Sequence, residues 1–149
     1  MIYVIVQVFC IIYLFVNTNV SSLDTLTHIL FAVAVMVGVA AVVSMKIGNL
    51  NVAPALKENH QLVTSGIYRW VRHPMYTSVL MFCFGLMLSN SHLASQLMMF
   101  VLCIDLVLKA RLEEILLDQR YPEYHDYQKN TGKFLPYLWF DKVPVNRTP

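Results

Sequence analysis

Residues 68–88 read YRWVRHPMYTSVLMFCFGLML, a short polar and aromatic stretch that runs directly into apolar sequence. The residue before a proline, here His73, is biased toward extended backbone. Pro74 itself suits the first turn of a helix, where its missing N–H costs no hydrogen bond. The His73-Pro74 step therefore predicts that a helix begins here and leaves Arg72 and His73 at the boundary between water and lipid.

The chain as a whole is too apolar for a soluble domain of its size. Of its 149 residues, 57% are hydrophobic and 13% charged, and the mean hydropathy is +0.55, whereas soluble domains are about 45–50% apolar. The net charge of +2 does not suggest general nucleic-acid binding, and the three cysteines are far apart, with no disulfide or metal-ligand spacing. We therefore expect a single integral membrane domain over residues 1–149, without a metal site or a nucleic-acid partner.

Four apolar stretches predict an all-α protein with about four transmembrane helices, over residues 2–16, 26–45, 75–88 and 93–108. Only the second stretch reaches the roughly 20 residues that span a bilayer. The first has neither a basic n-region nor an Ala-x-Ala-like cleavage site, so we interpret it as a span rather than a signal peptide. The last two are separated by a four-residue turn, SNSH. They predict a tight antiparallel hairpin, which either crosses fully or dips deeply into the bilayer.

Basic residues lie on only one side of this predicted topology. All eleven Lys and Arg residues fall within residues 46–74 or after residue 108, and the linkers 17–25 and 89–92 contain none. The positive-inside rule then places the N-terminus, the 46–74 linker and the tail in the cytoplasm. We expect a multi-pass protein of a bacterial inner membrane or an endoplasmic reticulum.

The hairpin should bring the polar residues of this face together. Arg72 and His73 enter its first arm, and Arg111, Glu113 and Glu114 leave its second arm on the same side, within side-chain reach. Basic groups that face carboxylates among aromatic rings suit a zwitterionic ligand with a flat ring. The same residues also have structural interpretations, as topology anchors, an aromatic belt or an i,i+4 ion pair.

Two further features of the second half bear on the site. Asp105 stands inside the second arm of the hairpin, and an acid within a membrane is a functional candidate unless it lies at the interface. Tyr121-Pro122 should end that arm, and Tyr124 and Tyr127 should share one face of a following helix. The stretch FLPYLWF (134–140) is expected to return to the membrane surface, with Tyr137 and Trp139 as anchors.

Four parts of the sequence together resemble the isoprenylcysteine carboxyl methyltransferase family. They are NHQLVTSGIYRWVRHPMYTS (59–78), the apolar hairpin, RLEEILL (111–117) and YPEYHDYQKNTGKFLP (121–136). More broadly, they resemble the membrane methyltransferases that include phospholipid N-methyltransferases. The resemblance implies two N-terminal spans over residues 1–45 and a catalytic linker, hairpin and tail over residues 46–136. It also implies a cytoplasmic pocket for S-adenosylmethionine, closed by the C-terminal tail, and a tunnel that opens to the membrane for a lipid substrate.

The resemblance assigns roles to individual residues. Arg72 and Arg111 would act in catalysis by orienting the substrate carboxylate. Glu114 is preferred over Glu113 as a cofactor ligand, because adjacent helical residues point about 100° apart and cannot both reach one atom. The residues implied to bind the cofactor are His60, Leu62, Val63, Gly66, Tyr68, His73, Tyr76, Glu113 and Glu114. Ser78 and Lys133 depart from the family pattern, in which Gly and Arg are common.

The implied reaction transfers a methyl group from S-adenosylmethionine to a membrane-embedded lipophilic acceptor and releases S-adenosylhomocysteine. The carboxylate of a prenylated cysteine is the leading acceptor, and because it is already ionised at neutral pH it needs no general base. An amine would first have to lose a proton. The alternatives are a phospholipid or small-lipophile N-, O- or S-methyltransferase, a non-catalytic membrane adaptor, and a relative of sterol reductases, for which the chain is short.

Overall fold

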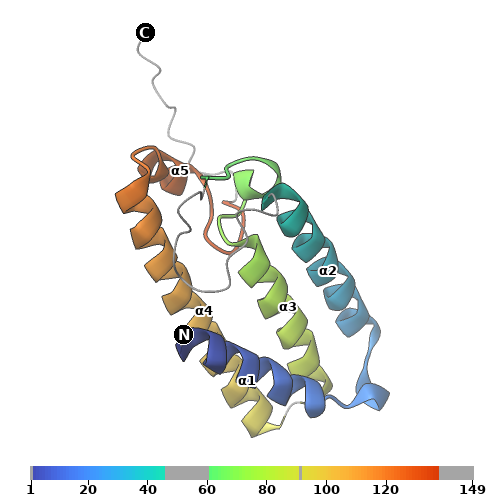
Figure 1. Cartoon of the computed structure of the whole chain (residues 1–149). Coiled ribbons are helices and arrows are strands. Elements are labelled where there is room, and N and C mark those ends of the chain that lie inside the picture. The colour runs from blue at the N-terminus through green and yellow to red at the C-terminus, as the bar shows by residue number, and fades with distance from the viewer. Residues whose placement is uncertain (1, 46–60, 91, 138–149) are drawn as a thin grey trace.

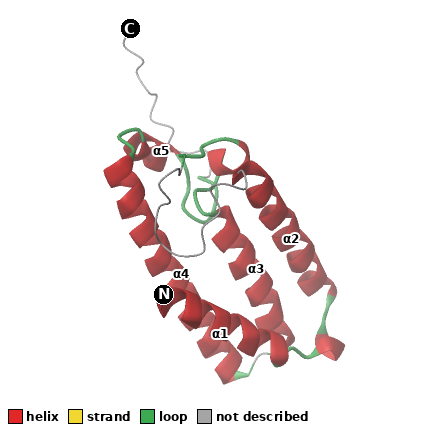
Figure 2. Cartoon of the chain, viewed as in Figure 1, coloured by secondary structure: helices red, strands yellow, loops and turns green. Residues whose placement is uncertain are grey.

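The computed structural model describes residues 2–45, 61–90 and 92–137. Within these ranges the chain is all-helical and forms no strand (Figures 1 and 2), which confirms the predicted class. The α-helices are α1 (Ile2–Val16), α2 (Thr25–Met45), α3 (Pro74–Ser89), α4 (Leu93–Arg120) and α5 (Tyr124–Asn130). Two short 3-10 helices, η1 (Val20–Ser22) and η3 (Gly66–Arg69), precede α2 and α3.

Helices α1 to α4 form a bundle in which α2 packs along α3, α1 along α4, and α3 along α4 (Figure 1). Helix α5 lies at the end of the bundle where α2 and α4 end and α3 begins. The apolar core lies where α1, α3 and α4 meet, and its buried members are Cys10, Leu14, Cys83, Leu86, Met99, Leu102 and Leu106. The α3–α4 hairpin predicted from the short turn is therefore present.

Several predicted helix boundaries are confirmed. Helix α3 begins at Pro74, with His73 as the N-cap residue at φ −123° and ψ 58°. Helix α4 continues without a break beyond the apolar stretch and ends at Arg120, and Tyr121 leaves the helix with φ −124° and ψ 105°. Since α4 has 28 residues, it is about 42 Å long at 1.5 Å per residue. Its last turns therefore extend past its apolar section.

The α2–α3 contact accommodates Ser78, one of the two departures from the pattern of the resembled family. The Ser78 hydroxyl on α3 donates a hydrogen bond to the Ala34 carbonyl oxygen on α2, at 2.7 Å. A Cβ atom at Gly38 would lie 2.8 Å from that hydroxyl oxygen. Ser78 therefore faces α2, and glycine at position 38 provides the space for its side chain.

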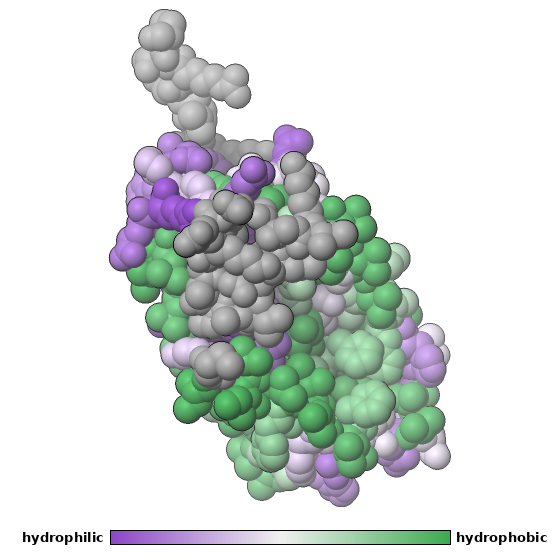
Figure 3. Space-filling view, viewed as in Figure 1, coloured by the Kyte–Doolittle hydropathy of each residue, from purple (hydrophilic) through white to green (hydrophobic). Residues whose placement is uncertain are grey.

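The exterior of the bundle is strongly apolar. Many large side chains on its helices are exposed, among them Ile5 at 66%, Phe9 at 60% and Val43 at 76%. Figure 3 shows hydrophobic residues between hydrophilic groups at the two ends. Within the described ranges, two helices, α2 and α4, are long and apolar enough to cross a membrane, and α1 and α3 are apolar but shorter.

Candidate functional site

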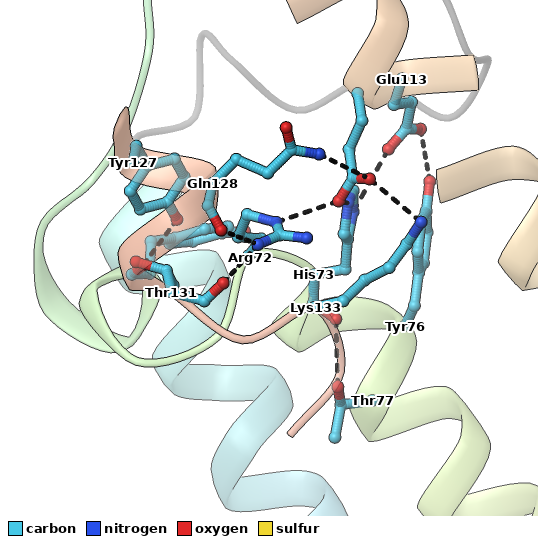
Figure 4. A network of polar contacts seen from close by, with 11 residues as sticks. Arg72, His73, Tyr76, Thr77, Glu113, Tyr127, Gln128, Thr131 and Lys133 are labelled. Atoms are coloured by element: carbon cyan, nitrogen blue, oxygen red, sulfur yellow. Dashed lines mark hydrogen bonds and ion pairs between the residues drawn. The ribbon is translucent and has the colours of Figure 1, made fainter. Parts of the chain in front are cut away.

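The predicted meeting of the two hairpin ends occurs at the end of the bundle that carries α5 (Figure 4). Side chains from the entry to α3, the last turns of α4, α5 and the segment after α5 form one connected group. We call this group the polar cluster; its members are Arg72, His73, Tyr76, Glu113, Glu114, Gln128 and Lys133.

Glu114 is the centre of the polar cluster. Its Oε1 atom lies 3.0 Å from Arg72 Nε and 3.1 Å from His73 Nε2. Its Oε2 atom accepts hydrogen bonds from Lys133 Nζ at 3.0 Å and Gln128 Nε2 at 3.4 Å. The residue is 7% exposed. A buried carboxylate with this many donors is held by charge and by hydrogen bonds together.

His73 lies between the two glutamates. Its Nε2 atom faces Glu114, and its Nδ1 atom lies 3.6 Å from Glu113 Oε2. Its ring stacks on Tyr76, with 5.4 Å between the ring centroids and 2° between the planes, and the Tyr76 hydroxyl donates a hydrogen bond to Glu113. The two adjacent glutamates thus reach opposite nitrogen atoms of one ring, which agrees with their divergent directions on a helix.

The segment after α5 lies alongside the entry to α3. Residues 131–136, here called the strap, form a parallel bridge between Gly132 and Val71. The backbone N–H of Arg72 donates to the Gly132 carbonyl oxygen at 2.8 Å, and that of His73 donates to the Lys133 carbonyl oxygen at 3.0 Å. These bonds tie the tail to the residues that carry the polar cluster.

Two side chains, of Thr77 and Arg72, reinforce the strap and the segment before it. The Thr77 hydroxyl on α3 donates to the Phe134 carbonyl oxygen at 2.7 Å. Arg72 Nη1 donates to the carbonyl oxygens of Gln128, at 2.6 Å, and Thr131. A Cβ atom at Gly132 would overlap the Leu135 carbonyl oxygen. The strap conformation therefore requires glycine at this position.

Tyrosines of α5 connect the strap region to η3. The Tyr127 hydroxyl donates to the Tyr68 carbonyl oxygen at 2.6 Å, and burial raises the pKa of Tyr127 to about 12. It therefore remains a neutral donor at neutral pH. Burial also raises the pKa of Tyr124, whose hydroxyl is buried and has no hydrogen-bond partner among the described residues. The rings of Tyr124 and Tyr127 meet edge to face at 5.7 Å, on the shared face that the sequence predicts.

The structure brings five of the predicted site residues into the polar cluster: Arg72, His73, Tyr76, Glu113 and Glu114. Arg111 is exposed on α4 and lies outside the cluster. Four others precede α3. Leu62 and Val63 are half-buried in the loop before η3, Gly66 begins η3 with φ +62°, and Tyr68 is buried within it. His60 lies outside the described residues, as does the predicted anchor Trp139.

Sequence reasoning did not include several cluster members. Lys133 is noted only as a departure from the family pattern, and Gln128 is not singled out, although both donate to Glu114. The carbonyl oxygens that hold Arg72 have no sequence signal, because every residue carries one. The spacing of Tyr124 and Tyr127 is the signal that points to this part of the tail.

Among residues 2–45, 61–90 and 92–137, no three His, Cys, Asp or Glu side chains are grouped so that they would hold a metal ion. The free cysteines Cys10 and Cys83 are buried, and Cys103 is partly buried.

Comparison with known proteins gives one family and two relatives. Residues 23–124 match the profile of the family described as phospholipid methyltransferase. The nickel-cobalt-cadmium resistance protein NccN of Alcaligenes xylosoxydans xylosoxydans is 32% identical over 112 residues, which cover 72% of this chain and 52% of that protein. The cobalt-zinc-cadmium resistance protein CzcN of Cupriavidus metallidurans is 34% identical over 85 residues, covering 55% and 38%. The chain thus matches about half of the first relative and less of the second.

Proposed function

The chain belongs to the phospholipid methyltransferase family, and from this premise we propose that it transfers a methyl group from S-adenosylmethionine to a lipophilic acceptor in the membrane. The observation that carries the proposal is the polar cluster. It combines two adjacent carboxylates, several basic groups and a stacked His73-Tyr76 pair at the end of an otherwise apolar bundle.

The donor set fits the amino-acid end of S-adenosylmethionine. Glu113 and Glu114 can accept hydrogen bonds from an ammonium group, and Arg72 and Lys133 can pair with a carboxylate. Of the basic partners of Glu114, Lys133 is the most exposed, with 25% of its side chain accessible against 8% for Arg72. Lys133 is therefore the partner that a ligand ammonium can replace at lowest cost. The cofactor would supply the electrophilic methyl group, and the residues of the chain would hold and orient it.

The buried hydroxyl of Tyr124, which has no partner in the described part of the chain, supports a ligand on the same side. A buried hydroxyl without a partner costs about 1–3 kcal/mol, so an external acceptor group would recover free energy. Tyr124 lies beside Tyr127 on α5, next to the strap. The strap and α5 would then close the cofactor pocket, as the family resemblance implies.

For the membrane topology we propose four spans, with the polar cluster on the cytoplasmic side. Helices α1 and α3 have 15 and 16 residues, or about 22–24 Å of helix, which is less than the roughly 30 Å hydrocarbon core. Such helices cross where the bilayer thins or where flanking residues reach the interface. The distribution of Lys and Arg supports the orientation.

Two acceptor classes remain in the proposal. The carboxylate of a prenylated cysteine is the first candidate, because it needs alignment and exclusion of water but no proton transfer. One observation favours the second class, a protic phospholipid or small lipophile. The Arg72 guanidinium, a predicted ligand of the substrate carboxylate, binds Glu114 and two carbonyl oxygens of the chain itself, and Arg111 is exposed outside the cluster.

The first test is calorimetric binding of S-adenosylhomocysteine to the detergent-purified full chain. We expect saturable binding by the wild type and at least tenfold weaker binding, equivalent to about 1.4 kcal/mol, for His73→Ala and Glu114→Ala. Lys129→Ala is the control, since Lys129 is exposed and pairs only with exposed Asp126 in the described region.

Absence of binding by a folded wild type would reject the methyltransferase proposal and favour the membrane-adaptor alternative. If the wild type binds, methyl transfer to prenylcysteine is compared with transfer to phosphatidylethanolamine in mixed micelles. Turnover of only one of them assigns the acceptor class.

A further inference from the structure

A second group of polar side chains lies deeper in the apolar bundle than the polar cluster. Lys109 on α4 is 3% exposed, and its Nζ atom donates to Gln7 Oε1 on α1 at 3.1 Å. The same Nζ atom lies 5.1 Å from the centre of the Tyr76 ring on α3. Asp105, one turn earlier on α4, is 5% exposed. Three helices thus contribute polar groups to this region.

One carboxylate oxygen of Asp105 has no hydrogen-bond partner within the part of the chain that the structure describes. This oxygen, Oδ2, is buried. Lys109, the nearest basic residue along the helix, interacts with Asp105 by charge, but its amino group donates its hydrogen bond to Gln7 and lies over the Tyr76 ring. A buried carboxylate oxygen without a hydrogen-bond partner is costly, and an acid in a membrane helix is a functional candidate by default. A ligand group that carries an N–H, O–H or S–H could donate a hydrogen bond to Asp105 Oδ2.

Tyr76 connects this deeper group to the polar cluster. Its hydroxyl donates to Glu113, and its ring lies under the Lys109 amino group. Asp105 is eight residues before Glu113 on the same helix, or about 12 Å toward the apolar part of the bundle. A lipophilic acceptor that approaches the cluster from the hydrocarbon side would pass the level of Asp105.

We propose that Asp105 is the proton-accepting residue of the acceptor subsite, and that the acceptor is a lipophile with a protic nucleophile, such as an amine, a phenol or a thiol. The inference rests on the proposed function and specifies its substrate class. In the transfer, the nucleophilic atom forms a bond to the methyl carbon while the sulfonium carbon–sulfur bond breaks. The proton of the nucleophile passes to Asp105 Oδ2, and S-adenosylhomocysteine is the neutral leaving product.

The neighbours of Asp105 suit this role. The titratable groups that face it are Cys10 from α1, Tyr76 from α3 and Lys109 from α4. Lys109 is a positioning residue: Gln7 and the Tyr76 ring hold its charge near Asp105 without occupying Oδ2. An ionised acceptor carboxylate, in contrast, would meet the negative charge of Asp105 at this point.

The test measures binding first, so that it does not depend on activity. The full-length protein in dodecylmaltoside is titrated with N-methyldodecylamine and with dodecanoate, each with and without saturating S-adenosylhomocysteine. The wild type is compared with Asp105→Asn and with Asp118→Asn, which changes an exposed acid on the same helix. Partition of the probes into micelles is common to all three proteins and cancels in the comparison.

We expect Asp105→Asn to weaken amine binding at least tenfold and to leave dodecanoate and S-adenosylhomocysteine binding unchanged, while Asp118→Asn behaves as the wild type. Asp105→Glu should restore part of the amine affinity. Equal amine affinity in the wild type and Asp105→Asn would overturn the inference. Loss of S-adenosylhomocysteine binding in Asp105→Asn with no rescue by Asp105→Glu would also overturn it, since the role of the carboxylate would then be structural.

Turnover provides the second readout. With an amine acceptor at saturating cofactor, Asp105→Asn should lower kcat by about 10²- to 10⁴-fold, the range for loss of a general base, with a smaller change in KM for the cofactor. One result would contradict the inference but leave the proposed methyltransferase function intact. In that result, the wild type and Asp105→Asn methylate prenylcysteine equally well, and the wild type does not methylate the amine. A wild type that binds no S-adenosylhomocysteine would instead reject the proposed function.

Discussion

At the scale of single residues, the Glu114 carboxylate has the greatest effect on the polar cluster, because Arg72, His73 and Lys133 all lie within 3.1 Å of it. Glu114→Gln would leave these basic groups without their shared anion in a buried site. Removal of one partner from a buried ion pair costs about 3–5 kcal/mol. We expect a clear fall in the midpoint of thermal unfolding in detergent.

Glu113→Gln is the matched control for that variant. Glu113 is more exposed, at 21% of its side chain, and its hydrogen-bond donor is the neutral Tyr76 hydroxyl. The amide can still accept that hydrogen bond, so the expected loss is smaller. Equal loss in the two variants would show that the basic groups around Glu114 do not depend on its charge.

Asp24 provides a pH-dependent contribution at the start of α2. Its Oδ1 atom accepts hydrogen bonds from the hydroxyl of Thr27, at 2.7 Å, and from its backbone N–H, at 2.9 Å, and these bonds lower the pKa of Asp24. A lowered carboxyl pKa stabilises the folded state above the ordinary value of about 3.9, and the effect is lost as the pH falls through the folded pKa. The wild type should therefore lose stability below about pH 4 relative to Asp24→Asn, whose amide does not titrate.

The measurement is the difference in unfolding midpoint between the wild type and Asp24→Asn, from about pH 7 to about pH 3. A constant difference over this range would mean that the Thr27 contacts do not favour the ionised form of Asp24. Other carboxylates titrate in both proteins and cancel in the difference.

At the scale of elements, the α2–α3 contact depends on the complementary pair Gly38 and Ser78. Alanine at position 38 would place a Cβ atom 2.8 Å from the Ser78 hydroxyl oxygen and disturb its hydrogen bond to Ala34. Without that clash, Gly→Ala within a helix gains up to about 1 kcal/mol. Gly38→Ala should therefore destabilise the wild type but be neutral or stabilising when Ser78 is also changed to Gly.

A double-mutant cycle of unfolding free energies measures this coupling. Neighbouring residues that share a contact typically show interaction energies of about 0.5–3 kcal/mol. Additive effects of Gly38→Ala and Ser78→Gly would contradict the proposed fit between the two helices.

The strap can be tested at the same scale through Gly132. A Cβ atom here would overlap the Leu135 carbonyl oxygen, so Gly132→Ala must displace the strap from Val71 and with it the backbone bonds to Arg72 and His73. We expect binding of S-adenosylhomocysteine to fall at least tenfold, or about 1.4 kcal/mol. Thr77→Val, which removes the hydroxyl that bonds the Phe134 and His73 carbonyl oxygens but leaves the backbone bonds of the strap, should cause a smaller loss. Unchanged binding in Gly132→Ala would exclude the strap from the cofactor site.

At the scale of the whole molecule, the proposed four spans would place the loop around η1 and the hairpin turn on one side of the membrane, and η3 and α5 on the other. Single cysteines at Ser21 and His125, both exposed, should then react with a membrane-impermeant maleimide from opposite sides. The background replaces Cys10, Cys83 and Cys103 with alanine. Labelling is compared in right-side-out and inverted vesicles; reaction of both positions from one side would reject the four-span topology.

Much of the fold and part of the site could be predicted because their determinants are local. Pro74 starts α3, Pro122 follows the end of α4, and the short turn after Ser89 makes α3 and α4 antiparallel neighbours. These features bring His73 next to Glu113 and Glu114 without depending on how the other helices pack. Apolar composition and the positions of basic residues likewise need no tertiary information.

Only the tertiary structure determined which charged and polar side chains pair with one another. It assigned Arg72 to Glu114 and to carbonyl oxygens near the strap, left Arg111 exposed, and brought Lys133 to the same carboxylate. It also joined Gln7 to Lys109, more than a hundred positions later, and left one Asp105 oxygen unpaired among the residues that the structure describes. Sequence spacing determines which residues share a face of one helix. Pairing between helices depends on how the packed helices are shifted and rotated relative to one another. Side-chain packing of the whole bundle determines that shift and rotation.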